Sequence, residues 1–354
     1  MGRTPARRRR AAAPRAWLPV IGCLALAGCA INPRIDLSDY QRDGRSGAAL
    51  EMPFFPQTEN QCGPAALATV LTQSGIEMSP AALTPQVYLP AREGSLQVEL
   101  MAAARRAGRI PFTLEPRVEA LLAELDAGRG VLLLQNLRTP HYPAWHYAVL
   151  TGYDPGRNAF RLNSGTQQAV WQPAPQVLRT WNWGGDWAMV TLVPGELPAM
   201  TFGAQEEAES ARRFFRALAD FEAVAGGAAA RPAWLAAEMR WPDRPEPALA
   251  LGNLAYQKAR LDEAVEWYGI GLRLQPENPA LANNLASVLG EAGCPRAGES
   301  VLRPLAVKLE NPSPWAEPIG RTLSELAARA GEDPAFCGDY RVRPTPRGVT
   351  RSPN

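Results

Sequence analysis

The chain has 354 residues, of which 46% are apolar and 20% are charged. This length and composition are sufficient for two domains with separate cores, and they exclude global disorder and a collagen-like fibre. The formal net charge is +2, but residues 1–28 hold six Arg and no acidic residue. Removal of that segment would leave a net charge of −4. A mature chain of that charge is a poor binder of nucleic acid, so we expect no nucleic acid partner.

The first 28 residues have the pattern of a secretory signal peptide: an Arg-rich start, a short apolar run and small residues. The apolar run is too short for a transmembrane helix, which needs about 20 residues. The following Leu26-Ala27-Gly28-Cys29 resembles the bacterial lipobox, in which the cysteine becomes the first residue and is lipidated. The resemblance implies a lipid anchor on Cys29 at the periplasmic side of the cell envelope, and Ala30 favours the outer membrane. An ordinary secreted protein is the alternative.

Residues 29–50 are polar and rich in turn-forming residues, which is typical of a tether. Residues 51–195 predict an α+β domain, because helical periodicity comes first and strand-like runs come later. Helices are predicted at 64–74, 96–107 and 117–127, and strands at 131–134, 147–151, 160–162 and 188–193.

The rest of the chain predicts an all-α domain. A linker at 196–210 leads to helical repeats at 211–310 and to a final helix and tail at 311–354. A period of 34 residues supports the repeats, since small, aromatic and proline positions recur and match the tetratricopeptide pattern. The recurring positions are Ala230, Trp234, Ala237 and Pro242, followed by Ala264, Tyr268, Gly271 and Pro276. A generic helical bundle is the alternative.

Cys62 is the first candidate for chemistry. It stands directly before Gly63-Pro64 and an apolar helical run, and proline suits the first turn of a helix. At a helix N-terminus the helix dipole and the free N–H groups favour the thiolate, which is the nucleophilic form of cysteine. A lone cysteine is more often a small buried apolar residue.

His146 is the second candidate. It opens a predicted strand, residues 154–158 form a turn, and residues 159–163 return as a second strand. We therefore expect Asn163 near His146 at the open end of the hairpin. At that place its amide oxygen would accept a hydrogen bond from one imidazole nitrogen, so that the other nitrogen faces a thiol. We expect His141, in a proline-flanked loop, at the surface or lining a groove. Without a nearby nucleophile, a buried structural histidine would be the preferred interpretation of His146.

These segments resemble the papain-like cysteine peptidases of the double-glycine, bacteriocin-processing type. The resemblance covers about residues 51–195 and rests on Gln57, on Cys62-Gly63-Pro64-Ala65, on His146-Tyr-Ala-Val-Leu-Thr-Gly-Tyr-Asp and on Leu162-Asn163. It implies a papain-like fold and hydrolysis of a protein or peptide substrate. In that family a cysteine attacks the carbonyl, a histidine acts as general base and then acid, an Asp or Asn orients the histidine, and a glutamine helps form the oxyanion hole. By position these roles fall on Cys62, His146, Asn163 and Gln57.

Two positions depart from the family pattern. Gln57 precedes Cys62 by five residues, where the relatives usually have six, and the orienting residue is Asn163 rather than the commoner Asp. The chain also has no Gly-x-x-x-x-Gly-Lys-[Ser/Thr] loop for ATP, as a peptidase attached to a transporter would have. Cleavage after Gly-Gly is therefore not carried over to this chain.

The five cysteines predict one disulfide. Cys23 leaves with the signal peptide, Cys29 receives lipid and Cys62 is the nucleophile, so Cys294 and Cys337 remain. In an oxidising periplasm this pair favours a disulfide that fastens the tail to the last repeat and contributes roughly 2–4 kcal/mol. Because the chain has only two His and most cysteines are assigned, we expect no metal site and no cofactor.

Three functions fit these patterns. The first is an anchored cysteine peptidase whose repeats recruit a protein substrate or partner through their concave face. The second is a non-catalytic adaptor lipoprotein that keeps the papain-like fold while the repeats bind. The third is acyl transfer or amide hydrolysis on cell-wall or small-molecule amides, because a fold does not determine its reaction. Three catalytic residue types at fitting positions favour the first.

Overall fold

The structure of the 354-residue chain is a computed structural model. It describes residue 2 and residues 36–337, with gaps at 43, 45, 58–60, 200–203, 310–311, 330 and 332. The predicted signal peptide and the lipidation site Cys29 lie outside the described residues. Among the described residues, no helix is both long and apolar enough to cross a bilayer.

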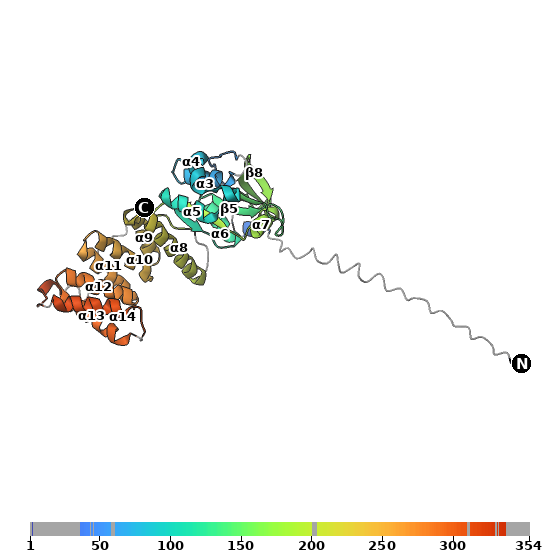
Figure 1. Ribbon diagram of the computed structural model, residues 1–354. Coiled ribbons are helices and arrows are strands. Elements are labelled where there is room, and N and C mark those ends of the chain that lie inside the picture. Colours follow the sequence, from blue (N-terminus) through green and yellow to red (C-terminus); the bar gives the residue numbers. More distant parts are fainter. Residues whose placement is uncertain are drawn as a thin grey trace.

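A seven-stranded sheet forms the centre of the N-terminal region, and every neighbouring pair in it is antiparallel (Figure 1). Its strands are β1 (Ala48–Ala49), β4 (Ile110–Thr113), β5 (Val131–Asn136), β6 (Trp145–Asp154), β7 (Ala159–Ser164), β8 (Gln167–Pro173) and β9 (Ala188–Leu192). They follow the order β4-β9-β5-β6-β7-β8, and β1 pairs with β6. A small separate sheet joins β2 (Tyr88–Leu89) to β3 (Gly94–Ser95).

Helices cover both faces of the large sheet. One face packs against α3 (Cys62–Gln73), α4 (Pro80–Val87) and α5 (Gln97–Arg106), and the other against α6 (Val118–Asp126) and α7 (Ala174–Trp183). Strand β5 is buried on both faces. Leu132 and Leu134 join the core under α3 and α5, whereas Val131 and Leu133 join the core with α6 and α7. Alternation of side chains along a strand covered on both faces explains the uninterrupted apolar run in the sequence.

The predicted α+β organisation is confirmed. All three predicted helices and all four predicted strands are present within a few residues of their expected bounds. The elements that were not predicted include helices α4 and α7 and strands β4 and β8. Strand β4 was not predicted because it contains Pro111. Proline cannot donate a backbone hydrogen bond and is tolerated in a sheet mainly at an edge, which is where β4 lies.

The C-terminal region is helical throughout its described part. Its helices are α8 (Ala204–Ala225), α9 (Gly227–Arg240), α10 (Pro245–Gln257), α11 (Leu261–Leu274), α12 (Pro279–Glu291), α13 (Pro295–Lys308) and α14 (Ala316–Ala328). Helix α8 begins inside the segment predicted as a linker. Helices α10 and α12 begin 34 residues apart, and so do α11 and α13. The structure therefore repeats a helical hairpin with the period found in the sequence.

Small residues let the repeated helices pack closely. A Cβ added to Gly252 of α10 would lie 2.5 Å from the ring of Tyr268 of α11. One hairpin later, a Cβ on Gly298 of α13 would lie 2.6 Å from the carbonyl oxygen of Ala286 of α12. Side chains larger than glycine would force these helices apart, so the small positions of the period mark contacts between helices.

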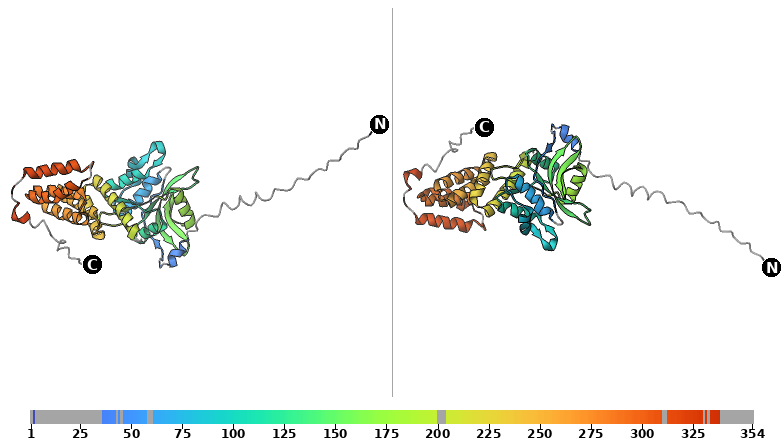
Figure 2. Two further views of the ribbon diagram at one scale, coloured as in Figure 1. Left: turned by 90° about the horizontal axis from the view of Figure 1, so that it is seen from below. Right: turned by 90° about the horizontal axis from the view of Figure 1, so that it is seen from above.

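The core of the sheet region continues into the first helices of the C-terminal region. Phe214 of α8 packs edge-on against Phe112 of β4, with ring centroids 5.9 Å apart. Phe215 contacts Trp234 and Trp241, and all five side chains belong to one buried cluster with residues of the sheet. Figure 2 shows α8 and α9 lying between the sheet and the remaining helices. The sheet region and the first helices of the C-terminal region therefore share one core.

The tail is held to the last hairpin by a disulfide and by a helix cap. Cys294 and Cys337, the pair expected from the cysteine count, are disulfide-bonded, with Cα atoms 5.6 Å apart. The carboxylate of Asp333 accepts hydrogen bonds from the backbone N–H groups of Arg296 and Ala297, at 2.9 and 2.7 Å. These N–H groups lie in the first turn of α13, where an acidic side chain is favourable.

Candidate functional site

Cys62 is the first residue of α3 and is partly exposed. It is the only free cysteine among the described residues. Next to it, a Cβ added to Gly63 would lie 2.4 Å from Oγ of Ser95, so glycine is what allows β3 to approach the first turn of the helix. Cys62 therefore lies at the positive end of the helix dipole, beside the N–H groups of the first turn.

Tyr147 connects β6 to the start of α3. Its hydroxyl donates a 3.2 Å hydrogen bond to the carbonyl oxygen of Ser95, and its ring packs edge-on against Trp187 with centroids 6.0 Å apart. Tyr147 and Cys62 pack in the same apolar cluster. Burial, with a smaller effect of the nearby Cys62, raises the pKa of Tyr147, so the phenol stays a neutral donor.

His146, the residue before Tyr147, lies near the beginning of β6 and is half-buried. Its Nε2 atom is 2.9 Å from Oγ of Ser164 at the end of β7. Burial lowers the pKa of His146, because a charged imidazolium is poorly solvated there. The neutral ring is therefore favoured, which is the form that can accept a proton. No hydrogen bond between the described residues joins His146 to Sγ of Cys62.

Asn163 does not hold the imidazole. Its Nδ2 atom donates to the carbonyl oxygen of Pro53 at 3.2 Å, and its Oδ1 atom accepts from the backbone N–H of Ala169 at 2.9 Å. The hydrogen bond expected between Asn163 and His146 is therefore not formed. The side chain instead ties β7 to the segment that precedes α3.

Ser164 is the polar neighbour of His146 that the sequence analysis missed. The β6–β7 ladder shifts register between Leu150 and Gly152, and the β7–β8 ladder shifts between Leu162 and Ser164. A bulge changes which residue faces a given neighbour, and counting residues from a turn does not reveal it. The only available signal was the position of Ser164 at the end of the returning strand.

Gln57 reaches the same end of the sheet through its backbone. Its N–H donates a 3.1 Å hydrogen bond to the carbonyl oxygen of Gly165, the residue after Ser164. The Gln57 side chain forms no hydrogen bond with the described residues, and residues 58–60 lie outside them. His141 is exposed in the loop between β5 and β6 and does not take part in this arrangement.

Exposed apolar side chains flank the site on two segments. Leu137, Tyr142 and Trp145 precede His146 and are 52%, 78% and 59% exposed. Leu96 and Val98 follow Ser95 and are 40% and 64% exposed. Tyr147 links the strand that follows the first segment to Ser95, which directly precedes the second.

The comparison with protein families decides what this region is similar to. Residues 49–183 match the Peptidase_C39 like family. The match covers a little over a third of the chain and includes Gln57, Cys62, His146 and Ser164. It supports a papain-like cysteine peptidase domain around the antiparallel sheet, followed by the all-α region.

Two solved structures are also similar to this part of the chain. One is a double glycine motif protease from an AMS/PCAT transporter in complex with the leader peptide, with 22% identity and a TM-score of 0.32 over 41% of this chain and 93% of that one. The other is a C39-like peptidase from Bacillus anthracis, with 17% identity and a TM-score of 0.35 over 42% of this chain and 98% of that one. The comparison with curated proteins gave no match.

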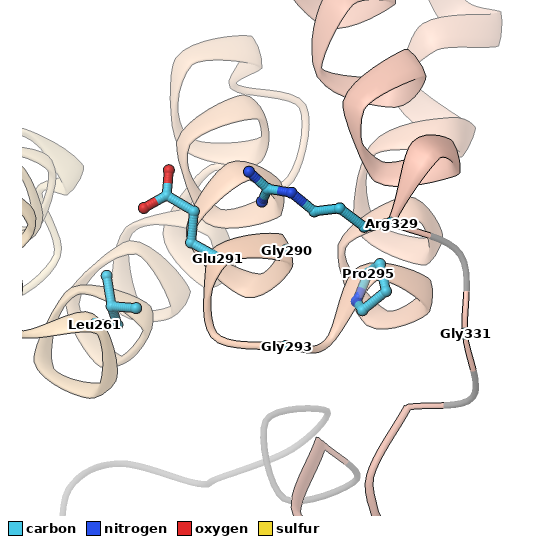
Figure 3. A pocket seen from close by; sticks show the side chains of 7 residues that line it. All are labelled: Leu261, Gly290, Glu291, Gly293, Pro295, Arg329 and Gly331. Atoms are coloured by element: carbon cyan, nitrogen blue, oxygen red, sulfur yellow. The ribbon is translucent and has the colours of Figure 1, made fainter.

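A separate hollow of about 590 Å³ lies in the helical region (Figure 3). Glu291 and Arg329 supply its charged groups, and Tyr256 donates a 2.7 Å hydrogen bond to the Glu291 carboxylate. The residues that line the hollow belong to α11–α13 and to the turns that follow α12 and α14. These helices lie far from α3 (Figure 1), so the hollow is distinct from the candidate site. Within the described part of the chain, no group of three or more His, Cys, Asp or Glu is placed to hold a metal ion.

Proposed function

We propose that the protein is a lipid-anchored cysteine peptidase of the cell envelope, with Cys62 as nucleophile and His146 as general base. The observation that carries the proposal is the position of Cys62 at the N-terminus of α3, joined through Ser95 and Tyr147 to the strand that bears His146. This arrangement lies in the segment that matches the peptidase family.

The reaction follows from the chemistry of these groups. The neutral imidazole takes the thiol proton, and the Cys62 thiolate attacks the peptide carbonyl carbon. The resulting oxyanion is stabilised by the backbone N–H of Cys62, with the Gln57 amide as a further donor. His146 then gives its proton to the leaving amine, and water hydrolyses the thioester to restore the thiol. No cofactor or metal takes part.

The substrate is a protein or peptide that lies extended over the site. The exposed apolar side chains beside His146 and Ser95 offer surface for its side chains. The repeated hairpins supply a second surface, and we propose that they are tetratricopeptide-like and recruit the substrate or an assembly partner. The recurrence of hairpins after 34 residues supports this part of the proposal.

The anchor is a separate part of the proposal, and it is carried by Leu26-Ala27-Gly28-Cys29. Lipid on Cys29 would hold the protein on the periplasmic side of the outer membrane, because each buried CH₂ contributes about 0.8 kcal/mol. Metabolic labelling with an alkyne fatty acid tests it. We expect label and membrane recovery to be lost in Cys29→Ser and kept in Cys23→Ser; equal labelling of both variants would contradict the anchor.

The catalytic proposal is tested by comparing new protein N-termini in cells that make the native chain, Cys62→Ala or His146→Ala. We expect a set of cleavages that requires both residues. His141→Ala is the matched control, since His141 is the other histidine of the chain and is exposed in the adjacent loop. Identical termini in the native, Cys62→Ala and His146→Ala cells would overturn the peptidase proposal.

A non-catalytic adaptor is the second candidate function. It is favoured by one observation: the ring of His146 meets the hydroxyl of Ser164 and not a carboxylate or an amide oxygen. In this case the repeats do the binding, and Cys62→Ala leaves the cellular phenotype unchanged. Reaction of Cys62 with a thiol probe near pH 6 separates the two, because an activated thiolate reacts faster there than an ordinary cysteine.

A further inference from the structure

We propose that Ser164 is the positioning residue for His146: Nε2–H donates to Oγ of Ser164, which leaves Nδ1 as the nitrogen that accepts the Cys62 proton. The inference rests on the proposed function for the role of Nδ1. It assigns to Ser164 the part that the sequence analysis gave to Asn163.

Other polar side chains near the ring are already engaged. Gln135 is the register partner of His146 on β5, but its Nε2 atom donates to Oγ1 of Thr180 at 2.7 Å. Asn163 donates to Pro53 and accepts from Ala169. Among the described residues, Ser164 is therefore the polar side chain that forms a hydrogen bond with the imidazole.

The direction of the hydrogen bond follows from chemistry. A neutral imidazole carries one N–H, and the tautomer is determined by the partner of each nitrogen. If the Ser164 hydroxyl donated its hydrogen bond to Nε2, the ring proton would be on Nδ1. Nδ1 could then not accept a proton from a thiol. A base that faces Cys62 through Nδ1 thus requires Nε2–H to donate to Ser164.

A hydroxyl holds the ring without giving it a charged partner. A carboxylate at this position would favour the imidazolium, whereas a neutral hydroxyl does not. Of the elements packed against β6, helix α3 carries the Cys62 thiol at its first residue. The charged groups of β7 and α6 have partners of their own: Arg161 with Glu51, Glu119 with Tyr40, Glu124 with Arg129 and Asp126 with Tyr153. Burial lowers the pKa of His146, in line with a ring that lacks a countercharge.

The two histidines of the chain make the ring directly observable by ¹⁵N NMR, with His141→Gln to assign the signals. We expect the Nε2–H tautomer of His146 in the native protein and in Ser164→Thr, which keeps the hydroxyl, and loss of that preference in Ser164→Ala.

Ser164→Asp should move the His146 titration to higher pH. Thr166→Asp is the charge control, because it adds the same charge at an exposed position of the next turn. An unchanged tautomer in Ser164→Ala, or equal shifts in both Asp variants, would overturn the positioning role.

The rate of Cys62 alkylation by iodoacetamide as a function of pH separates this inference from the proposed function. We expect Ser164→Ala to react roughly five- to tenfold more slowly at neutral pH, the loss that one hydrogen bond represents. Ser164→Asp should extend the reaction to lower pH. If the NMR signals respond to Ser164 but the alkylation does not, the positioning role stands and the Cys62–His146 coupling fails. If the His146 tautomer is the same with and without the Ser164 hydroxyl, the positioning role is wrong, whatever the rate of Cys62 alkylation.

Discussion

The helical region and the sheet region encode their contacts over different distances along the chain. In the helical region, Gly252 meets Tyr268 in the very next helix, and the pattern recurs one hairpin later. The candidate site combines Cys62, Ser95, His146 and Ser164 from four separate segments. A local repeat therefore specifies individual contacts, whereas a site assembled from distant strands depends on bulges that leave no periodic signal.

Two aromatic residues at equivalent positions of the helical repeat belong to different cores. Trp234 of α9 occupies the same position of the period as Tyr268 of α11, yet Trp234 belongs to the core shared with the sheet. Tyr268 belongs to a separate cluster with the disulfide-bonded Cys294 and Cys337. Equivalent positions of the repeat thus report on two different cores.

Replacing these two aromatic residues should have the largest effect. Tyr268 is 1% exposed, and loss of a buried aromatic side chain costs about 3–5 kcal/mol of unfolding free energy. In Tyr268→Ala we expect faster hydrogen exchange in α10–α13 and unchanged protection in β5 and β6. Mass spectrometry of the exchanged peptides measures both in one experiment.

Trp234→Ala is the matched variant for that prediction. Because Trp234 packs with Phe215 in the shared core, its loss should also raise exchange in the sheet. If both variants change exchange only in the helices, the two regions are energetically independent and the shared core does not couple them.

The disulfide should have the next largest effect. Replacing Cys294 and Cys337 together by Ala removes the link that holds the tail to α13, and we expect a loss of about 2–4 kcal/mol in the stability of the last hairpins. Thermal unfolding followed by circular dichroism measures it, and adding a reductant should destabilise the native protein but not the double variant. A reductant effect of the same size in the double variant would contradict the assignment.

Part of the site could be predicted from the sequence because it depends on local chemistry. Gly63-Pro64 marks the start of a helix, so Cys62 was expected at its N-terminus and is found there. His146 was expected at the beginning of a strand and lies at the second residue of β6. Both predictions rely on interactions within a few residues, where propensities act.

The rest of the site could not be predicted because it depends on register. Asn163 and Ser164 are adjacent, and a shift of one residue exchanges their faces. The register shift between Leu150 and Gly152 in the β6–β7 ladder therefore determines which of them shares a face with His146. The edge strand β4 was missed for a related reason: Pro111 reads as a breaker unless the position of the strand at the sheet edge is known.

The smallest effect concerns the proton equilibrium of His146. Burial lowers its pKa in the folded protein, while the unfolded chain has the ordinary value of about 6.5. Between these two values the unfolded state binds more protons, so stability rises with pH and falls on acidification, by at most about 1.4 kcal/mol per pH unit for one group. Well above pH 6.5 the histidine is protonated in neither state, and the effect ends. His146→Gln should therefore lose less stability than the native protein between pH 7 and pH 5 in urea unfolding.

The control is His141→Gln, which changes the exposed histidine of the neighbouring loop and should follow the native curve. If His146→Gln also follows it, the ring is not protected from protonation by the fold, and the site shares the solvent exposure of the loop beside it.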